Sequence, residues 1–538
     1  MDLSRWSANV SGVRIYTRDV VDSVRGPLRS ELLAGLSLAI DLGLGQPMDH
    51  MLRSSVLAQR MARELHLDAD SRERIFHSTV LAWIGCHADS FELAHLFSDD
   101  IEFRSATYTI DNRGLPLVSL MVGRTGGGRP ALRMAAAKAR FLAVGRAAVH
   151  DLIASHCHSA ATLAAALGMN SSMADILMCT FERWDGKGLP EGRAQTDIPL
   201  EMRVTQLADV AEIFLRNGGV HAAADMVRGR RGTQFDPELA DVFCDRASEL
   251  TEGLAESDPW AEALASAPVG VPLAGRELDE VLTAMGDFAD LKSPYTSGHS
   301  RGVAALAGAA AQAVGLPVSS QDAVRRAGWV HDLGRMGVSN AVWDKSGPLT
   351  AAEVERVHLH PFLSERILGR IPGCRRLATL AGAHHERLDG SGYPAGIGGE
   401  SLDMEQRILA AADAFHASLE PRPHRGALAS DEAVARLRRE AAEGRLDSDC
   451  VEAVLSAGGL RTRRRTPRPA MLTDREIEVL RLVCRGLSSR GIAELLVISP
   501  KTARNHIEHI YEKIAVTNRV GATLYAQRNG LLELPAAR

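Results

Sequence analysis

The chain has 538 residues, of which 45% are hydrophobic and 4% aromatic, and its formal net charge is −5. This length predicts several domains, and the apolar content is sufficient for packed cores. The seven cysteines include no Cys-X-X-Cys pair, which argues against a disulfide framework or a thiolate zinc finger. We find no signal-like amino terminus and no apolar run of about 18 residues, so we expect a cytoplasmic protein without a membrane segment.

The charge is unevenly distributed along the chain. Residues 461–538 contain 15 Lys and Arg against 7 Asp and Glu, a net charge of +8 that leaves −13 on the remainder. A basic segment attached to an acidic body indicates nucleic-acid binding by the carboxy-terminal segment alone.

In chain order, a short extension without a clear period is followed by helical patterns. From Glu31 onward apolar residues recur at three- and four-residue steps, with little sign of alternating strands. Two Gly- and Pro-containing segments, Arg124–Pro130 and Ala267–Gly275, indicate loops, and the basic segment Gly458–Ala470 indicates an extended linker. The pattern predicts an all-α chain.

These breaks divide the chain into six parts. We predict an N-terminal extension (1–30), a helical domain (31–250), a linker (251–275), a second helical domain (276–457), a basic linker (458–470) and a carboxy-terminal domain (471–538).

The two helical domains carry an internal repeat. Four pairs lie 204 residues apart: Phe181–Pro190 with His385–Pro394, His156 with His360, Arg203 with Arg407, and Asp209 with Asp413. Two pairs nearer the amino terminus lie 249 residues apart: His50 with His299, and Gly85 with Gly334. The change of offset means that the first copy has about 45 extra residues (249 − 204), around its Gly-rich loop. Two copies of one helical domain therefore stand in tandem.

Residue types that bind metals recur in the second copy between Trp329 and Pro423. They include His331-Asp332, His360, the triplet beginning at His384, and Asp413. Imidazoles and carboxylates without a cysteine suit Zn, Mn or Fe. The alternative is a set of buried structural histidines.

This stretch resembles the HD-GYP branch of the HD phosphohydrolases, because His384 to Pro394 reads H-H-E-R-L-D-G-S-G-Y-P. The resemblance implies seven metal ligands: His299, His331, Asp332, His360, His384, His385 and Asp413. Seven ligands exceed what one ion requires, so we expect two divalent ions, Fe, Mn or Zn, that share Asp332 as a bridging carboxylate. Some members use a glutamate before the first histidine to hold a third ion, and here that position is Tyr295.

The resemblance also implies a substrate-contact set. Asp332 and Arg335 would be catalytic, with Arg335 replacing a family lysine that neutralises phosphate. The other implied contacts are Gly392, Tyr393 and Pro394 at the pocket mouth and Arg422 and Arg425 on phosphate. The alternatives are a plain surface turn for the glycine-rich loop and a solvated charged face for the two arginines. Gly302, His416 and His424 also depart from the family pattern, so the metal ligands are complete while the substrate contacts are altered.

The first copy lacks most of the implied ligands. It has Ala82-Trp83 in place of the His-Asp pair and Thr180-Phe181 in place of the His-His pair. A hydrophobic pair cannot ligate a metal, so we interpret the first copy as a degenerate domain retained for dimerisation, ligand sensing or packing.

The carboxy-terminal domain shows helix start signals. Thr473 and Glu476 form a capping box, and Ser499-Pro500 places an N-cap before a proline at the first helical position. The sequence from Leu472, LTDREIEVLRLVCRGLSSRGIAELLVISPKTARNHIEHIYEKIAVTNR, resembles the LuxR-type helix-turn-helix and implies a small four-helix domain.

This resemblance implies a recognition helix over residues 500–514 that enters the major groove of double-stranded DNA, as a homodimer. Lys501 and Thr502 would reach phosphates, Arg504 and Asn505 would reach base edges, and His509 lies on an outward face. The alternative is a polar face of a protein-binding bundle.

The sequence thus leaves two main hypotheses for an all-α regulator with two tandem HD-type domains and a small four-helix DNA-binding domain. One is a metal-dependent phosphodiesterase, acting on cyclic di-GMP or another phosphoester, whose state is coupled to DNA binding. The other is a non-catalytic switch that responds to a nucleotide or a metal. A structural metal site is a third hypothesis.

Overall fold

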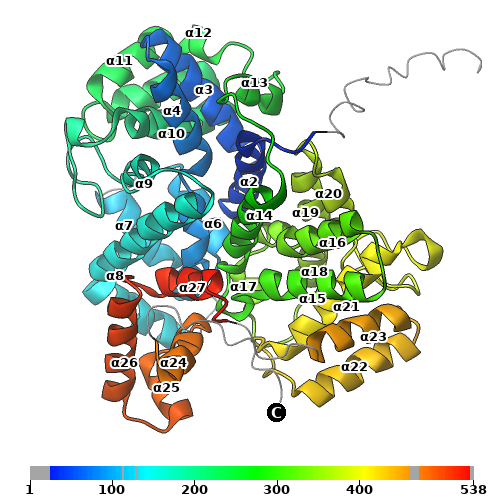
Figure 1. The fold of residues 1–538 in the computed structure, drawn as a ribbon. Coiled ribbons are helices and arrows are strands. Elements are labelled where there is room, and N and C mark those ends of the chain that lie inside the picture. The colour runs from blue at the N-terminus through cyan, green and yellow to red at the C-terminus, as the bar shows by residue number, and fades with distance from the viewer. Residues whose placement is uncertain (1–24, 112–113, 128–130, 460–471, 533–538) are drawn as a thin grey trace, which may run out of the picture.

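The computed structural model describes residues 25–111, 114–127, 131–459 and 472–532 (Figure 1). Helices dominate these ranges, and within them the only β pairings are two isolated bridges. The predicted fold class, all-α with two tandem HD-type domains and a small helix-turn-helix domain, is confirmed. Most of the predicted extension and of the basic linker lies outside the described residues, and the domain boundaries remain predictions.

The helices of the first copy are α2 (Arg29–Gly43), α3 (His50–Glu64), α4 (Ala69–Leu81), η1 (Ile84–Asp89), α5 (Ser90–Phe97), α6 (Asp100–Thr107), α7 (Gly114–Arg124), α8 (Ala131–Ala166), α9 (Ser171–Leu177), η2 (Gln195–Asp197), α10 (Leu200–Arg230), α11 (Pro237–Asp245), α12 (Ala247–Thr251) and α13 (Pro259–Ala265). In this copy, α10 packs against α3, α4 and α11 and is kinked at Gly219 (φ +76°).

The second copy follows the segment 266–274, which has no helix. Its helices are α14 (Gly275–Asp290), η3 (Pro294–Thr296), α15 (His299–Ala313), α16 (Val318–Val330), η4 (Leu333–Gly337), α17 (Asn340–Trp343), α18 (Ala351–His358), α19 (His360–Gly369), α20 (Arg375–Gly382), η5 (Gly399–Ser401), α21 (Met404–Leu419), α22 (Ser430–Ala442) and α23 (Ser448–Gly459).

The helices of the two copies correspond pairwise. α4 and α16 lie 249 residues apart at both ends, and α10 and α21 begin 204 residues apart. The loops after the repeated Glu-Arg pair also match, since Leu189 N donates to Phe181 O (3.1 Å) and Tyr393 N donates to His385 O (3.2 Å). The internal repeat in the sequence is therefore a repeat in the structure.

The two copies share one hydrophobic core. Helix α2 of the first copy is buried on nearly all sides and packs against α19 and η4 of the second copy. Gly35 of α2 lies so close to Ile371 that a Cβ at this position would come within 2.4 Å of the Ile371 Cδ1 atom. A helix that is apolar all round has to be enclosed by other elements, and here both copies enclose it.

The extra residues of the first copy form α5, α6, α7 and the amino-terminal part of α8, between the positions of Gly85 and His156. This segment also joins the copies. Buried Asp100 of α6 accepts from Ser339 Oγ (2.7 Å) and from Asn340 N (2.8 Å), and its second oxygen lies 3.3 Å from Lys292 Nζ.

The carboxy-terminal module consists of α24 (Asp474–Cys484), α25 (Ser489–Leu496), α26 (Pro500–Lys513) and α27 (Arg519–Arg528), around a core of its own. Helix α27 lies beside α8 of the first copy (Figure 1). Arg528 Nη2 donates to Thr162 O (2.7 Å), and Arg519 Nη1 lies 3.1 Å from a carboxylate oxygen of Glu92 in α5. The module therefore contacts the helices that contain the extra residues of the first copy.

No helix in the described ranges combines the length and the apolar character that a membrane crossing requires.

Candidate metal centre

Three histidines of the second copy have their ring orientation fixed by the backbone. The Nδ1–H groups of His331, His360 and His384 donate to the carbonyls of Gly328 (2.9 Å), Val357 (2.6 Å) and Ala381 (2.6 Å), each three residues earlier. A carbonyl only accepts, so Nδ1 carries the proton and each Nε2 presents its lone pair. All three rings are buried, and this pattern is typical of imidazoles that bind metals.

The carboxylate of Asp332 lies between two groups of histidines. Its Oδ2 is 3.8 Å from His299 Nε2 and 3.7 Å from His331 Nε2, whereas its Oδ1 is 3.3 Å from His360 Nε2 and 3.7 Å from His384 Nε2. One oxygen thus faces each group. This is the geometry of a carboxylate that bridges two ions.

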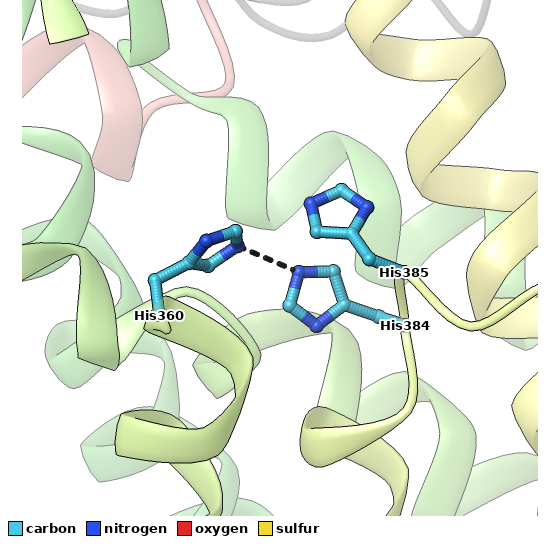
Figure 2. Close-up of side chains that lie close together, drawn as sticks. All are labelled: His360, His384 and His385. Carbon is cyan, nitrogen blue, oxygen red and sulfur yellow. Dashed lines mark hydrogen bonds between the residues drawn. The ribbon is translucent and has the colours of Figure 1, made fainter. Parts of the chain in front are cut away.

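Asp413 completes the group on the His299 side. Its Oδ1 lies 3.2 Å from His299 Nε2 and 3.9 Å from His331 Nε2, and its Oδ2 lies 3.6 Å from His385 Nδ1. The structure therefore brings together all seven residues that the sequence predicts as ligands. Figure 2 shows His360, His384 and His385 converging from α19 and from the segment after α20.

The lone pairs of the histidine nitrogens suit metal ions better than they suit hydrogen bonds within the protein. The Nε2 atoms of His360 and His384 face each other at 3.1 Å, although the backbone bonds leave a lone pair on each (Figure 2). His331 Nε2 is buried and has no hydrogen-bond partner among the described residues. Buried imidazoles that point lone pairs at one another are destabilising unless a cation lies between them.

The surroundings of the centre set the protonation states of its histidine and aspartate side chains. Burial lowers the pKa of His384 to about 3, so this imidazole is neutral and able to ligate. Burial opposes the charged form of Asp332, but Arg335 and His331 hold the pKa of this carboxyl well below its usual range. His384 therefore provides a neutral imidazole and Asp332 an anionic carboxylate, the donor types expected for divalent Zn, Mn or Fe.

Glu420 is a residue beside the centre that the sequence analysis did not single out. Its Oε2 lies 3.0 Å from His299 Nδ1 and its Oε1 lies 3.2 Å from His416 Nδ1. Burial disfavours protonation of His299, yet Glu420 and Asp413 raise the pKa of His299 to about 10. A carboxylate on the far nitrogen of a ligating histidine orients the ring and increases its basicity. The only sequence signal is an acidic residue one helical turn after His416.

A cleft of about 580 Å³ opens onto the centre. It is lined by Asp332 and Asp413 and by several cationic side chains: Arg335, Lys345, Arg422, Arg425 and Arg436. Arg335 Nη1 donates to Asp332 Oδ2 (3.2 Å), and its guanidinium lies 3.8 Å from the centre of the Trp343 ring. A cationic cleft beside a carboxylate–imidazole centre suits an anionic phosphoester.

The two predicted phosphate contacts of the Arg-Pro-His-Arg segment differ in their surroundings. Arg422 Nη2 donates to Glu420 Oε2 (2.8 Å). Arg425 donates to the carbonyls of Ala417 (2.6 Å) and Glu420 (3.1 Å), so its guanidinium holds the loop after α21. In the first copy this loop is absent because α10 continues through Gly219 as a kinked helix.

In the first copy, aromatic side chains occupy the position of the centre. Trp83 replaces the bridging aspartate, and its indole Nε1 donates to Asp209 Oδ1 (3.2 Å). The ring of Trp83 packs edge-on against Phe181 and Tyr108, at 5.3 and 5.7 Å between centroids. Asp209 also pairs with His50 Nε2 (3.0 Å). The carboxylate that would face an ion is therefore satisfied by protein donors.

The comparisons with known proteins agree with this geometry. Residues 283–450 match the HD domain family, and residues 470–526 match the family "Bacterial regulatory proteins, luxR family". A 3'3'-cGAMP-specific phosphodiesterase of Vibrio cholerae is 32% identical over 437 residues, which cover 80% of this chain and 94% of the relative. The chain belongs to the HD-GYP family.

This HD-GYP protein is also similar to a solved structure and to a second curated relative. The crystal structure of a cyclic GMP-AMP specific phosphodiesterase of V. cholerae (V-cGAP3) superposes with a TM-score of 0.57 at 28% identity, covering 81% of this chain and 99% of that chain. The cyclic di-GMP phosphodiesterase response regulator RpfG of Xanthomonas campestris is 35% identical, but the match covers 33% of this chain and 48% of the relative. The first similarity therefore spans both copies.

The Gly-Tyr-Pro loop of this HD-GYP protein is held by its own backbone and by Glu386. The Glu386 Oε1 atom accepts from Ala395 N (2.8 Å), and Gly392 passes so close to Arg387 that a Cβ would lie 2.4 Å from its backbone nitrogen. Tyr393 stacks on His358 with 3.8 Å between ring centroids and packs against His385 at 4.7 Å. The loop thus packs against His385 of the centre, and Gly392 is required for close packing, while the role of the loop at the pocket mouth remains a prediction.

The helix-turn-helix of the HD-GYP protein presents α26 as an exposed helix at the periphery (Figure 1). Five side chains predicted to contact DNA are all exposed: Lys501, Thr502, Arg504, Asn505 and His509. Ala503 and Ile510 of the same helix are buried in the core of the module. The predicted division of α26 into a buried face and a polar face is therefore present in the structure.

Proposed function

We propose that the second copy is a two-metal phosphodiesterase that acts on a cyclic dinucleotide. The observation that carries this proposal is the position of Asp332, whose two oxygens face two separate groups of histidines. One ion would be held by His299, His331, Asp332 and Asp413, and the other by Asp332, His360, His384 and His385. Two ions bound in this way would supply Lewis acidity for the attack of water on phosphorus.

The residues around the centre would orient the substrate. Arg335 carries a fixed positive charge at the cleft, where it would bind a phosphate oxygen while Trp343 holds its guanidinium in place. Arg422 would bind a second phosphate oxygen. Tyr393, whose one face is covered by His358, would stack a base on its other face, next to Gly392 and Pro394. Arg425 would act mainly by holding the loop that carries Arg422.

The proposed substrate class rests on the relatives and on the charge of the cleft. The V. cholerae relative that spans both copies is described as specific for 3'3'-cGAMP, and the X. campestris relative as acting on cyclic di-GMP. Both molecules carry two phosphodiesters, and the cationic residues of the cleft suit such a dianion.

The catalytic cleft is connected to the DNA-binding module by a short segment. Ser293 and Tyr295 line the cleft, and His299 begins α15 four residues after Tyr295. Ser297 lies between Tyr295 and His299, and its Oγ donates to Cys484 O of α24 (3.1 Å). We therefore propose that occupation of the cleft is coupled to DNA binding, a coupling that a non-catalytic switch would share.

The test is metal content and hydrolysis by purified protein. Wild type and Asp332→Ala are compared on 3'3'-cGAMP and cyclic di-GMP, with metal measured by mass spectrometry. Bound metal and turnover in wild type, with activity reduced on the order of 1,000-fold in the variant, would support the enzyme, since an active-site metal contributes several kcal/mol of transition-state stabilisation. Bound metal without turnover would favour the non-catalytic switch. Wild type without metal would refute the proposed centre.

We further propose that α26 reads the major groove of double-stranded DNA in a homodimer. Lys501 and Thr502 would bind phosphates, Arg504 and Asn505 would contact base edges, and His509 would lie along the same face. The sequence match of residues 470–526 to the luxR family and the exposure of these side chains support this proposal.

The binding sequence is obtained by in vitro selection from a random duplex pool with the full chain. Arg504→Ala should then weaken binding to the selected duplex by about 1–3 kcal/mol and relax the preference at one base pair. Arg276→Ala is the control, because Arg276 is an exposed arginine of α14, outside the module. Equal affinities of wild type and Arg504→Ala would contradict the assignment of α26.

A further inference from the structure

The first copy contains a cavity of about 220 Å³ beside the position that corresponds to the metal centre. Its walls are mainly apolar. The lining includes Phe97, Phe103, Met121, Leu152, Ile153 and Phe181. An apolar cavity of this size admits a small organic molecule.

The extra residues of the first copy build much of this cavity. Leu93 belongs to α5, Leu117 and Met121 to α7, and Val149 and Leu152 to α8. The equivalent interval of the second copy, between Gly334 and His360, is about 45 residues shorter, and its cleft is instead cationic and opens onto the metal centre. The loss of metal ligands in the first copy is thus accompanied by the addition of apolar walls.

Five residues that line the cavity each have a buried polar atom without a hydrogen-bond partner among the described residues. These atoms are Arg104 Nε, Tyr108 Oη, His156 Nε2, Glu182 Oε2 and Arg183 Nη2. Leaving such a group unsatisfied costs about 1–3 kcal/mol, so five in one cavity indicate a bound partner.

The states of these atoms define the chemistry of the partner. Burial lowers the pKa of His156 to about 3, so this imidazole is neutral, and the unpaired Glu182 Oε2 is left as a hydrogen-bond acceptor. The charge of Arg183 is already matched by Asp111 (2.9 Å) and Asp185 (3.4 Å), which leaves Nη2 as a donor for a neutral oxygen. These features favour an uncharged molecule with one donor and one acceptor group.

The same walls carry contacts to the DNA-binding module. Glu92, next to Leu93 in α5, pairs with Arg519, and Thr162 of α8 accepts from Arg528. A change in the position of α5 or α8 would therefore act on α27.

We propose that this cavity binds a small, uncharged, mainly hydrophobic organic molecule with a hydroxyl or amine donor, and that its occupation is transmitted to the DNA-binding module through α5 and α8. This site is separate from the catalytic centre and does not depend on turnover there.

The first test uses N-phenyl-1-naphthylamine, an apolar fluorescent probe with a single N–H donor, and the full chain. We expect saturable binding with one probe per chain. Leu152→Trp fills the cavity and should weaken binding at least tenfold. Leu142→Trp is the matched control, because Leu142 lies on the same helix, is 65% exposed and does not line the cavity.

A second variant tests the polar recognition. His156→Phe keeps an aromatic ring against Trp83 and Phe181 but removes the unpaired Nε2 atom, and it should weaken probe binding about 3- to 10-fold. The probe should also change hydrogen exchange in α27 of wild type and not of Leu152→Trp.

Several outcomes would overturn the proposal: no saturable probe binding by wild type, binding by Leu152→Trp equal to that of Leu142→Trp, or unchanged exchange in α27. If circular dichroism shows that Leu152→Trp does not fold, His156→Phe decides, and unchanged affinity refutes the assignment. Removal of metal by a chelator should leave probe binding intact, which separates this site from the proposed phosphodiesterase.

Discussion

In the first copy, Asp209 accepts hydrogen bonds from the indole of Trp83 and from His50, whereas in the second copy the equivalent Asp413 faces three histidine nitrogens at 3.2 to 3.9 Å. The equivalent helices occur in the same order, and α3 and α15, like α4 and α16, are equal in length. In the first centre, Asp209 is satisfied by protein donors, and the ring of Trp83 packs against Phe181 and Tyr108. In the second centre, the lone pairs of His360 Nε2 and His384 Nε2 point at each other.

This difference shows how a duplicated fold divides its tasks. An aromatic centre stabilises its domain directly through burial of apolar surface. A cluster of imidazoles and carboxylates costs free energy when it is empty, and that cost is offset when cations bind. One copy therefore contributes stability and a cavity, while the other retains the donor set for metals.

The junction between the copies should give the largest effect on stability. Asp100→Asn removes the charge that compensates buried Lys292 and Arg104, and we expect it to lower the free energy of unfolding by about 3–5 kcal/mol. Chemical denaturation monitored by circular dichroism measures this change. Asp99→Asn is the control, because Asp99 caps α6 from the surface and asparagine caps equally well.

The contribution of Asp100 to the free energy of unfolding should depend on pH. Burial would raise the pKa of Asp100, but Lys292 and Arg104 hold it well below its usual range. A lowered pKa stabilises the fold at pH values above the unfolded-state pKa of about 3.9, and this contribution is lost as the pH falls below it. The stabilities of wild type and Asp100→Asn should therefore converge in acid, and a constant difference between pH 7 and pH 3 would contradict this assignment.

Equivalent positions in the two centres should respond differently. Phe181→Ala removes a ring that packs against Trp83 and His156, so we expect a loss of about 3 kcal/mol in unfolding free energy and unchanged metal content. His385→Ala, at the matching position, should instead reduce metal content, with a small change in the stability of the metal-free protein. If Phe181→Ala also releases metal, the two copies are not separate in function.

The smallest expected effect concerns the carboxylates that contact the Nδ1 atoms of His299 and His50, namely those of Glu420 and Glu212. Glu420→Gln should weaken metal affinity about 10- to 100-fold, because it weakens the hydrogen bond that orients His299. Glu212→Gln is the matched control, since Glu212 makes the same contact to His50 in the first copy. Metal titration of both variants measures the difference, and equal affinities would exclude a positioning role for Glu420.

The sequence predicted well those features that depend on short stretches of chain. The helix starts at Thr473 and Ser499, with their caps, follow from local hydrogen-bonding chemistry and are present in the structure. The exposed polar face of α26 follows from the helical period in the same way. The placement of each site residue in a functional role remains a proposal.

Other features could not be predicted because their partners are distant in the sequence. Glu420 reaches His299 across 121 residues, and Asp100 reaches Lys292 across 192. The Gly-rich segment looked like a simple loop, yet the neighbouring helices α7 and α8 form the wall of a cavity. Neither hydrophobic period nor motif spacing carries information about such contacts.

The sequence by itself determined the all-α fold, the repeat, the family and the residue types of both centres, because these depend on periodicity and on motifs a few residues long. The tertiary structure alone decided which oxygen of Asp332 faces which histidines, that the two copies share one core, and that α27 contacts the helices around the first-copy cavity. These are consequences of packing, in which side-chain positions are set by neighbours from remote parts of the chain.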